Sequence, residues 1–138
     1  MTFAIYAFCS DDAPPMTNES LAVELRTYFR DEKNFRVEFE QLPFEDEESL
    51  ALFWDKWLVR ISYEEGESVE DEVRGAQLSV AAEHGARVAH MRRMIRAVFG
   101  TENDKVYTNQ IIYVMEFLKN HKGAVLYDPQ QANFVDEI

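Results

Sequence analysis

The chain has 138 residues, of which 46% are hydrophobic, and its 26 acidic residues outnumber 14 basic ones to leave a formal net charge of −12. This length is typical of one domain, and the apolar content favours a packed core over a disordered acidic chain. Because affinity for nucleic acids and for anionic membranes comes from Lys and Arg, the charge argues against both as ligands. We therefore predict one domain over residues 1–138 that binds neither nucleic acid nor membrane.

Strand and helix patterns alternate in the first part of the chain. The apolar run 2–9 predicts a strand covered on both faces. Thr17 or Asn18 is placed to cap a helix whose apolar stripe continues to Phe29. Alternation of apolar and charged residues then predicts a strand over 35–40 with one solvated face.

The middle of the chain predicts a loop, a strand and a helix. The acidic run 45–48 is typical of a loop or a short helical turn. Alternation over 57–64 predicts a strand that pairs antiparallel with 35–40. Ser68 begins an alanine-rich helix that continues to Val80.

The last third of the chain predicts further helices and one strand. His84 and Gly85 kink or divide the preceding helix, and the apolar stripe over 87–99 predicts that a helix resumes there. Another helix begins at Thr108 or Asn109, and a short apolar run predicts a final strand over 124–127.

The order of these elements is strand, helix, strand, strand, helices, strand. This order predicts an α+β fold with an antiparallel sheet of about four strands. We expect the helices to pack on one face of that sheet, in a ferredoxin-like or related sandwich.

The residue types that carry catalysis or bind metals form no recognisable pattern. The three histidines, His84, His90 and His121, lack the spacing of a zinc site, and the five glycines form no phosphate-binding loop. The single cysteine, Cys9, needs no oxidising compartment, so we predict a buried strand residue in a cytoplasmic protein. We predict no catalytic residue, no metal and no cofactor.

The charges fall into blocks. Residues 11–48 carry twelve carboxylates against four bases, 64–72 carry six carboxylates without a base, and 74–96 carry five arginines against one glutamate. An acidic block is either a solvated loop or, beside aromatic side chains, a surface that meets a basic groove on a partner. The candidate partner-binding residues are Glu45, Asp46, Glu47, Glu48, Trp54, Glu64, Glu65, Glu67 and Glu70.

Three arginines stand out on the helix predicted over 87–99. Arg92, Arg93 and Arg96 either pair with the chain's own carboxylates or simply solvate an amphipathic helix, or else they contact an anionic ligand or the acidic surface of a second copy. The second interpretation predicts a homodimer.

The C-terminal part of the chain, a helix followed by Gly123 and the strand and turn 124–130, resembles that of bacterial immunity proteins of toxin systems. The rest of the chain is similar to them in size and charge. The resemblance implies a cytoplasmic protein without catalysis that binds the active site or substrate groove of a cognate toxin. The expected partner is therefore a toxin, or another protein with a basic surface.

Two other functions stay open at this point. A ligand-sensing or regulatory module would dimerise through its sheet and hold a small molecule in an apolar pocket. An enzyme with a dispersed site would show a cleft in which His, Tyr or carboxylate groups converge.

Overall fold

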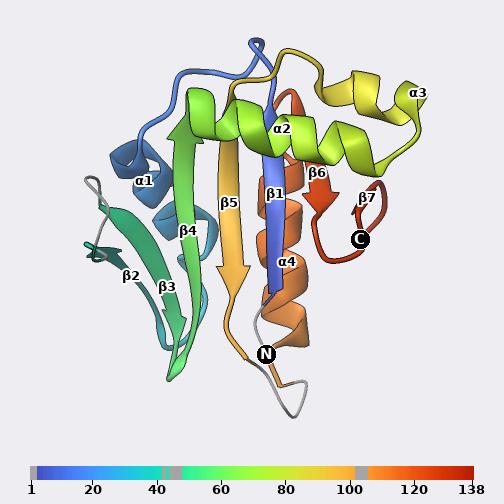
Figure 1. Ribbon diagram of the computed structural model, residues 1–138. Helices are drawn as coiled ribbons and strands as arrows, with labels where there is room; N and C mark the ends of the chain where they lie inside the picture. Colours follow the sequence, from blue (N-terminus) through green and yellow to red (C-terminus); the bar gives the residue numbers. More distant parts are fainter. Residues whose placement is uncertain (1–2, 42, 44–47, 102–105) are drawn as a thin grey trace.

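The computed structural model describes residues 3–41, 43, 48–101 and 106–138 (Figure 1). The strands are β1 (Phe3–Cys9), β2 (Phe35–Glu40), β3 (Ser49–Trp54), β4 (Trp57–Glu65), β5 (Arg93–Phe99), β6 (Ala124–Asp128) and β7 (Asn133–Phe134). Within the described residues they form one sheet of seven strands in the order β2-β3-β4-β5-β1-β6-β7. Every neighbouring pair of strands is antiparallel.

Helices cover both faces of this sheet. They are α1 (Asn18–Tyr28), α2 (Glu67–Ser79), α3 (Ala82–Gly85) and α4 (Thr108–Lys119), with a 3-10 turn, η1, over Ala86–Val88. In Figure 1, α1 and α4 lie behind the sheet, while α2 and α3 lie in front of it. None of the described helices is long and apolar enough to pass through a membrane.

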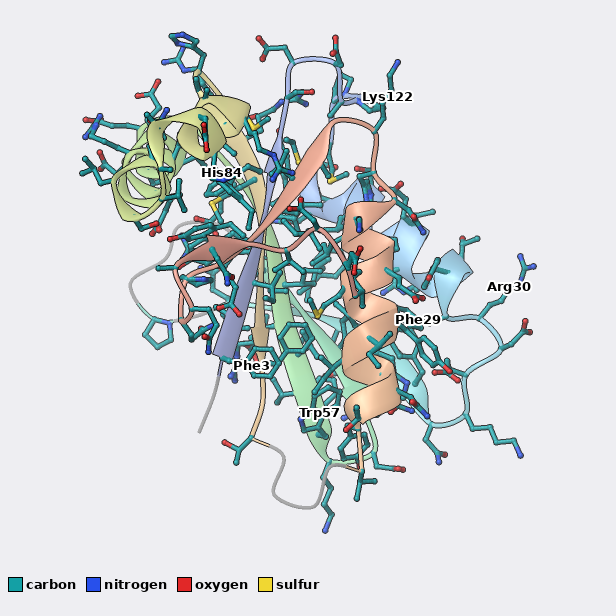
Figure 2. The ribbon with its side chains drawn as sticks, turned by 90° about the vertical axis from the view of Figure 1, so that its right-hand side faces the viewer. Phe3, Phe29, Arg30, Trp57, His84 and Lys122 are labelled. Carbon is teal, nitrogen blue, oxygen red and sulfur yellow. The ribbon has the colours of Figure 1, made fainter. Side chains whose placement is uncertain are left out.

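The two faces of the sheet bury different side chains, because successive residues of a strand point to opposite faces. In β1, Ile5 and Cys9 belong to the core beneath α1 and α4, whereas Phe8 belongs to a second core beneath α2. Figure 2 shows Phe29 and Trp57 close to α4, and both belong to the first core. The sheet is therefore the middle layer of three.

The arrangement predicted from the sequence is wrong, although the chain does combine helices and an antiparallel sheet as an α+β fold. The sheet has seven strands within the described residues and not about four. Helices pack on both faces, so the fold is not a ferredoxin-like sandwich with one covered face.

The largest difference lies at 87–99, where a helix was predicted: the structure has the end of η1 at 87–88 and the central strand β5 over Arg93–Phe99. β5 pairs with β4 on one side and with β1 on the other. Ile95 and Ala97 are buried in the core beneath α1 and α4, and Met94 is buried beneath α2. A strand buried on both faces has an almost continuous apolar sequence. Such a run also contains apolar residues at helical spacing, so it can be mistaken for a helix.

A second difference is β3, a strand over Ser49–Trp54 where no element was predicted from the sequence. β3 lies between β2 and β4, so the predicted direct pairing of 35–40 with 57–64 is also wrong. Trp54 pairs with Trp57 across a two-residue turn in which Asp55 has a φ of 55°. Asp tolerates this left-handed conformation better than most residues, because its short side chain bonds the local backbone.

Gly123 provides a test of the packing before β6. Its φ is 76°, and a Cβ atom built there would overlap the Ser10 hydroxyl oxygen. We expect Gly123→Ala to lower the free energy of unfolding by about 2 kcal/mol, from the strained backbone and the overlap together. Urea denaturation measures the change.

The matched control is Gly75→Ala within α2, where a Cβ atom meets nothing within 4 Å. Alanine favours a helix over glycine, so this change should raise stability by about 0.5 kcal/mol or more. Combining Ser10→Gly with Gly123→Ala should recover only the part that comes from the overlap. Equal stability of Gly123→Ala and the natural protein would contradict the analysis.

Candidate functional site

The sheet topology collects acidic segments at one end of the sheet, the upper end in Figure 1. The register pairs Glu40 with Ser49, and it pairs Glu65 and Cys9 with Arg93. The start of β3 and the ends of β1, β2 and β4 therefore lie at the same end. We call this the acidic end and define it by Asp11, Asp12, Glu48, Glu65 and Glu67, all of which are exposed.

Asn18, the first residue of α1, hydrogen-bonds to the backbone of two acidic segments, the one that leads into β3 and the one that ends β4. Its Nδ2 donates to the backbone oxygen of Glu48 at 2.9 Å, and its Oδ1 accepts from the backbone N–H of Tyr63 at 2.8 Å. Thr17 caps the same helix, since its side chain accepts from the N–H of Ser20 at 3.1 Å. The prediction of a cap at Thr17 or Asn18 is thus confirmed at Thr17.

The candidate binding residues have different environments. Glu48, Glu65 and Glu67 are exposed, and Glu65 accepts a hydrogen bond from the Tyr63 hydroxyl at 3.0 Å. Glu45, Asp46 and Glu47 lie outside the described residues. The sequence predicted the chain positions of these acids, but only the strand register shows that their segments lie at the same end of the sheet.

Trp54 does not lie at the acidic end. It is the last residue of β3, at the opposite end of the sheet, and its relative exposure is 3%. Its ring packs against Phe29 at 5.1 Å and Phe35 at 4.7 Å between centroids. Trp54 therefore belongs to the core and offers no exposed anchor to a partner.

Glu64 is bound by an arginine of its own chain. Arg96 lies with its Nε 2.8 Å from Glu64 Oε2 and with its Nη2 3.3 Å from Glu72 Oε1. Arg96 also donates to the Tyr6 hydroxyl at 3.1 Å. Burial by itself would lower the pKa of Arg96, but its hydrogen bond to Glu64 and the nearby negative charges outweigh burial and raise it.

Arg92 and Arg93 are also engaged within the chain. Arg92 Nε lies 2.6 Å from Glu70 Oε1. Arg93 Nη2 donates to the backbone oxygens of Ser10 at 2.6 Å and Ala13 at 2.9 Å, which holds the loop after β1 in place. Neither arginine lies on a helix, so the predicted basic helix face is wrong.

The spacing of the arginines explains how the sequence misled. On a helix, residues 93 and 96 would share one side, whereas in a strand a spacing of three places them on opposite faces. Arg93 accordingly contacts the loop after β1, and Arg96 contacts Glu72 of α2. Pairing with the chain's own carboxylates, which the sequence left open, is found for Arg92 and Arg96, whereas Arg93 donates to backbone oxygens.

Potential metal ligands and the single thiol offer no obvious chemistry. Among the described residues, no group of three or more His, Cys, Asp or Glu side chains is placed to hold a metal ion. Cys9 is buried, and its thiol donates to the backbone oxygen of Ala7 at 3.5 Å. Burial raises the pKa of the Cys9 thiol, and the positive charge of Arg93 opposes this in part.

Comparisons with known proteins found no relative of this chain. No protein-family model matches the sequence, and neither a curated protein nor a solved structure matches it. The resemblance to immunity proteins therefore stays a prediction, and the function has to be inferred from the geometry of the described residues.

Replacing Arg96 tests the internal ion pairs. Arg96→Met leaves Glu64 and Glu72 partly buried without their counter-charge, and we expect a loss of about 2 kcal/mol in the free energy of unfolding. Arg74→Met is the control, because Arg74 pairs with Asp71 on an exposed surface and should contribute less than about 0.5 kcal/mol. Equal effects of the two changes in urea denaturation would refute the assignment.

Cys9 gives a prediction of pH dependence. Because the thiol has a higher pKa in the folded than in the unfolded chain, its contribution to stability is complete below the unfolded pKa of about 8.5 and is lost as pH rises through the folded pKa. Cys9→Ala should therefore reduce the fall in stability between about pH 8 and pH 9.5. Rapid reaction of the folded protein with Ellman's reagent at pH 8 would contradict a buried, protonated thiol.

Proposed function

We propose that this chain is a non-catalytic binding protein that neutralises a cognate bacterial toxin by covering a basic surface of the toxin with its acidic end. The observation that best supports this proposal is the presence of exposed carboxylates from three separate segments of the chain along one end of the sheet. A net charge of −12 adds a long-range attraction for a basic partner.

The carboxylates of the acidic end differ from the other candidate acids because they form no ion pair within the described residues. Glu64 and Glu70 each have an arginine within 3 Å. No ion pair among the described residues joins Glu48, Glu65 or Glu67 to a base. The unpaired carboxylates keep their field in solvent, and such a field raises the rate of encounter with a cationic surface.

Because Glu64 and Glu70 are already paired with arginines, the proposed interface contains fewer residues than the sequence suggested. We place Glu48, Glu65 and Glu67 in direct contact with the toxin, together with the neighbouring Asp11 and Asp12. Glu64 and Glu70 support the surface from within the chain, and Trp54 has no part in it. The carboxylates take the place of an anionic substrate in the basic groove, which blocks the toxin without any chemical step.

The resemblance of the C-terminal segment to immunity proteins makes a toxin the expected partner, and another protein with a basic surface would meet the same geometry. The cytoplasm is the expected compartment, because the lone cysteine needs no oxidising environment. Exposed carboxylates also disfavour nucleic acids and anionic membranes as ligands.

Charge reversal tests the acidic end. The triple variant Glu48→Lys, Glu65→Lys, Glu67→Lys should slow association with the toxin encoded beside the gene at least about tenfold at low salt, because it replaces attraction by repulsion. Stopped-flow mixing measures the association rate, and protection of growth during co-expression of the toxin gives a second readout.

The matched control changes three exposed acids outside the acidic end, Asp31→Lys, Glu116→Lys and Glu137→Lys, with the same change in net charge. Its association rate should fall by less than about threefold. A triple variant at the acidic end that associates as fast as this control would overturn the proposed interface. Failure of the natural protein to bind the toxin at all would overturn the proposed function.

A further inference from the structure

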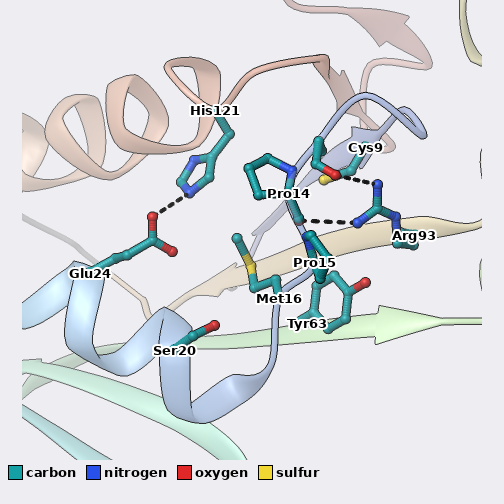
Figure 3. Close-up of a pocket in the computed structure, with 10 residues that line it drawn as sticks. Cys9, Pro14, Pro15, Met16, Ser20, Glu24, Tyr63, Arg93 and His121 are labelled. Carbon is teal, nitrogen blue, oxygen red and sulfur yellow. Dashed lines mark hydrogen bonds and ion pairs between the residues drawn. The ribbon is translucent and has the colours of Figure 1, made fainter.

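A cavity of about 200 Å³ lies beside the acidic end, on the face of the sheet that α1 and α4 cover (Figure 3). Its walls come from the loop after β1, from α1, from the ends of β1 and β4, from the start of β5, and from His121, two residues after the C-terminal end of α4. Pro14, Pro15, Met16 and the ring of Tyr63 supply most of the apolar lining.

Two hydrogen-bond acceptors face each other at one side of this cavity. His121 Nδ1 lies 2.9 Å from the backbone oxygen of Phe117. A carbonyl oxygen can only accept, so Nδ1 carries the hydrogen and donates it, and in the neutral ring Nε2 is then an acceptor. Nε2 lies 3.6 Å from Glu24 Oε1, whose carboxylate also only accepts.

Neither acceptor satisfies the other while the ring is neutral. Nε2 is a buried atom without a hydrogen-bond partner among the described residues, and the His121 side chain is only 13% exposed. The Glu24 side chain is 47% exposed and reaches the cavity from α1. When the ring is neutral, this side of the cavity has no donor, and its accessible group is the carboxylate of Glu24.

The opposite side of the cavity is already satisfied. Arg93 lines it, but its guanidinium donates to the backbone oxygens of Ser10, Ala13 and Pro14. In Figure 3, Arg93 lies across the cavity from Glu24 and His121. A ligand with positive charge is accordingly directed toward Glu24, and its uncharged part is left among the prolines and Met16.

We infer that this cavity binds the ammonium group of a primary amine on a short apolar stem, with the ammonium against Glu24. An ammonium group carries three donors and a positive charge, which match the accessible carboxylate of Glu24. A volume of about 200 Å³ leaves room for a stem of a few carbon atoms. The inference does not depend on the proposed function, because the cavity faces α1 and needs no toxin.

The same chemistry is carried by a free small amine and by a lysine side chain of another protein. The probes are therefore n-butylamine, its neutral isostere n-butanol, and lysine capped at both ends. Binding is followed by two-dimensional NMR at pH 7.5, where the amines are charged. We expect n-butylamine to bind with a Kd on the order of 1 mM, to move the ring resonances of His121, and to bind at least about tenfold more tightly than n-butanol.

Glu24→Gln keeps the shape of the side chain and removes its charge, so binding of n-butylamine should weaken at least about tenfold. Glu19→Gln is the matched control, because Glu19 lies exposed in the first turn of α1 and does not line the cavity. It should bind as the natural protein does. The spectrum of each variant without ligand shows that the fold is retained.

The outcomes separate the two sources of the amine. Binding of both n-butylamine and capped lysine supports a site that also accepts a lysine side chain, whereas binding of n-butylamine alone supports a site for free amines. The inference is wrong if neither amine moves the His121 resonances, if n-butanol binds as tightly as n-butylamine, or if Glu24→Gln binds as well as the natural protein.

Discussion

The burial of β5 on both faces is the constraint on which the rest of the structure depends. β5 pairs along its length with β1 and β4, and its side chains enter both cores. Its position also fixes two charged groups, because Arg93 holds the loop after β1 and Arg96 joins Glu64 to Glu72 of α2. The strand that forms the centre of the hydrophobic core thus also positions the loop and the helix beside the acidic end.

The uneven distribution of charge along the chain has a structural origin. The arginine-rich segment does not form a separate basic surface, because its strand and the residue before it direct the guanidinium groups toward carboxylates and carbonyl oxygens of the same chain. Once these pairs are made, no ion pair among the described residues neutralises Glu48, Glu65 or Glu67 at the end of the sheet. The arginines neutralise the carboxylates near β5, so the net negative charge is concentrated on the acids at the end of the sheet. A surface of one charge can guide a partner of opposite charge toward it.

The sequence predicts well those elements whose pattern depends on one solvated face. The strands at 35–40 and 57–64 and the capped helix after Thr17 were found close to their predicted places, because alternation and capping are local signals. Buried elements gave mixed results: the run 2–9 was predicted as a strand and is β1, whereas β5 was predicted as a helix and no element was predicted at β3. The candidate site was predicted in part: the acidic residues were named, but their convergence and the pairing of Glu64 and Glu70 depend on strand register. The cavity beside Glu24 and His121 left no signal, because its walls come from segments far apart in the chain.

The two outer strands of the sheet bear on how the molecule behaves at high concentration. β7 has only two residues, and β2 carries Arg36, Glu38 and Glu40 in alternation along its length. A very short edge strand and an edge strand with charged side chains both disfavour pairing with a strand of another molecule, which protects against fibre growth and misassembly. A chain so rich in aromatic and branched residues can thereby keep a broad sheet without inviting open-ended polymerisation.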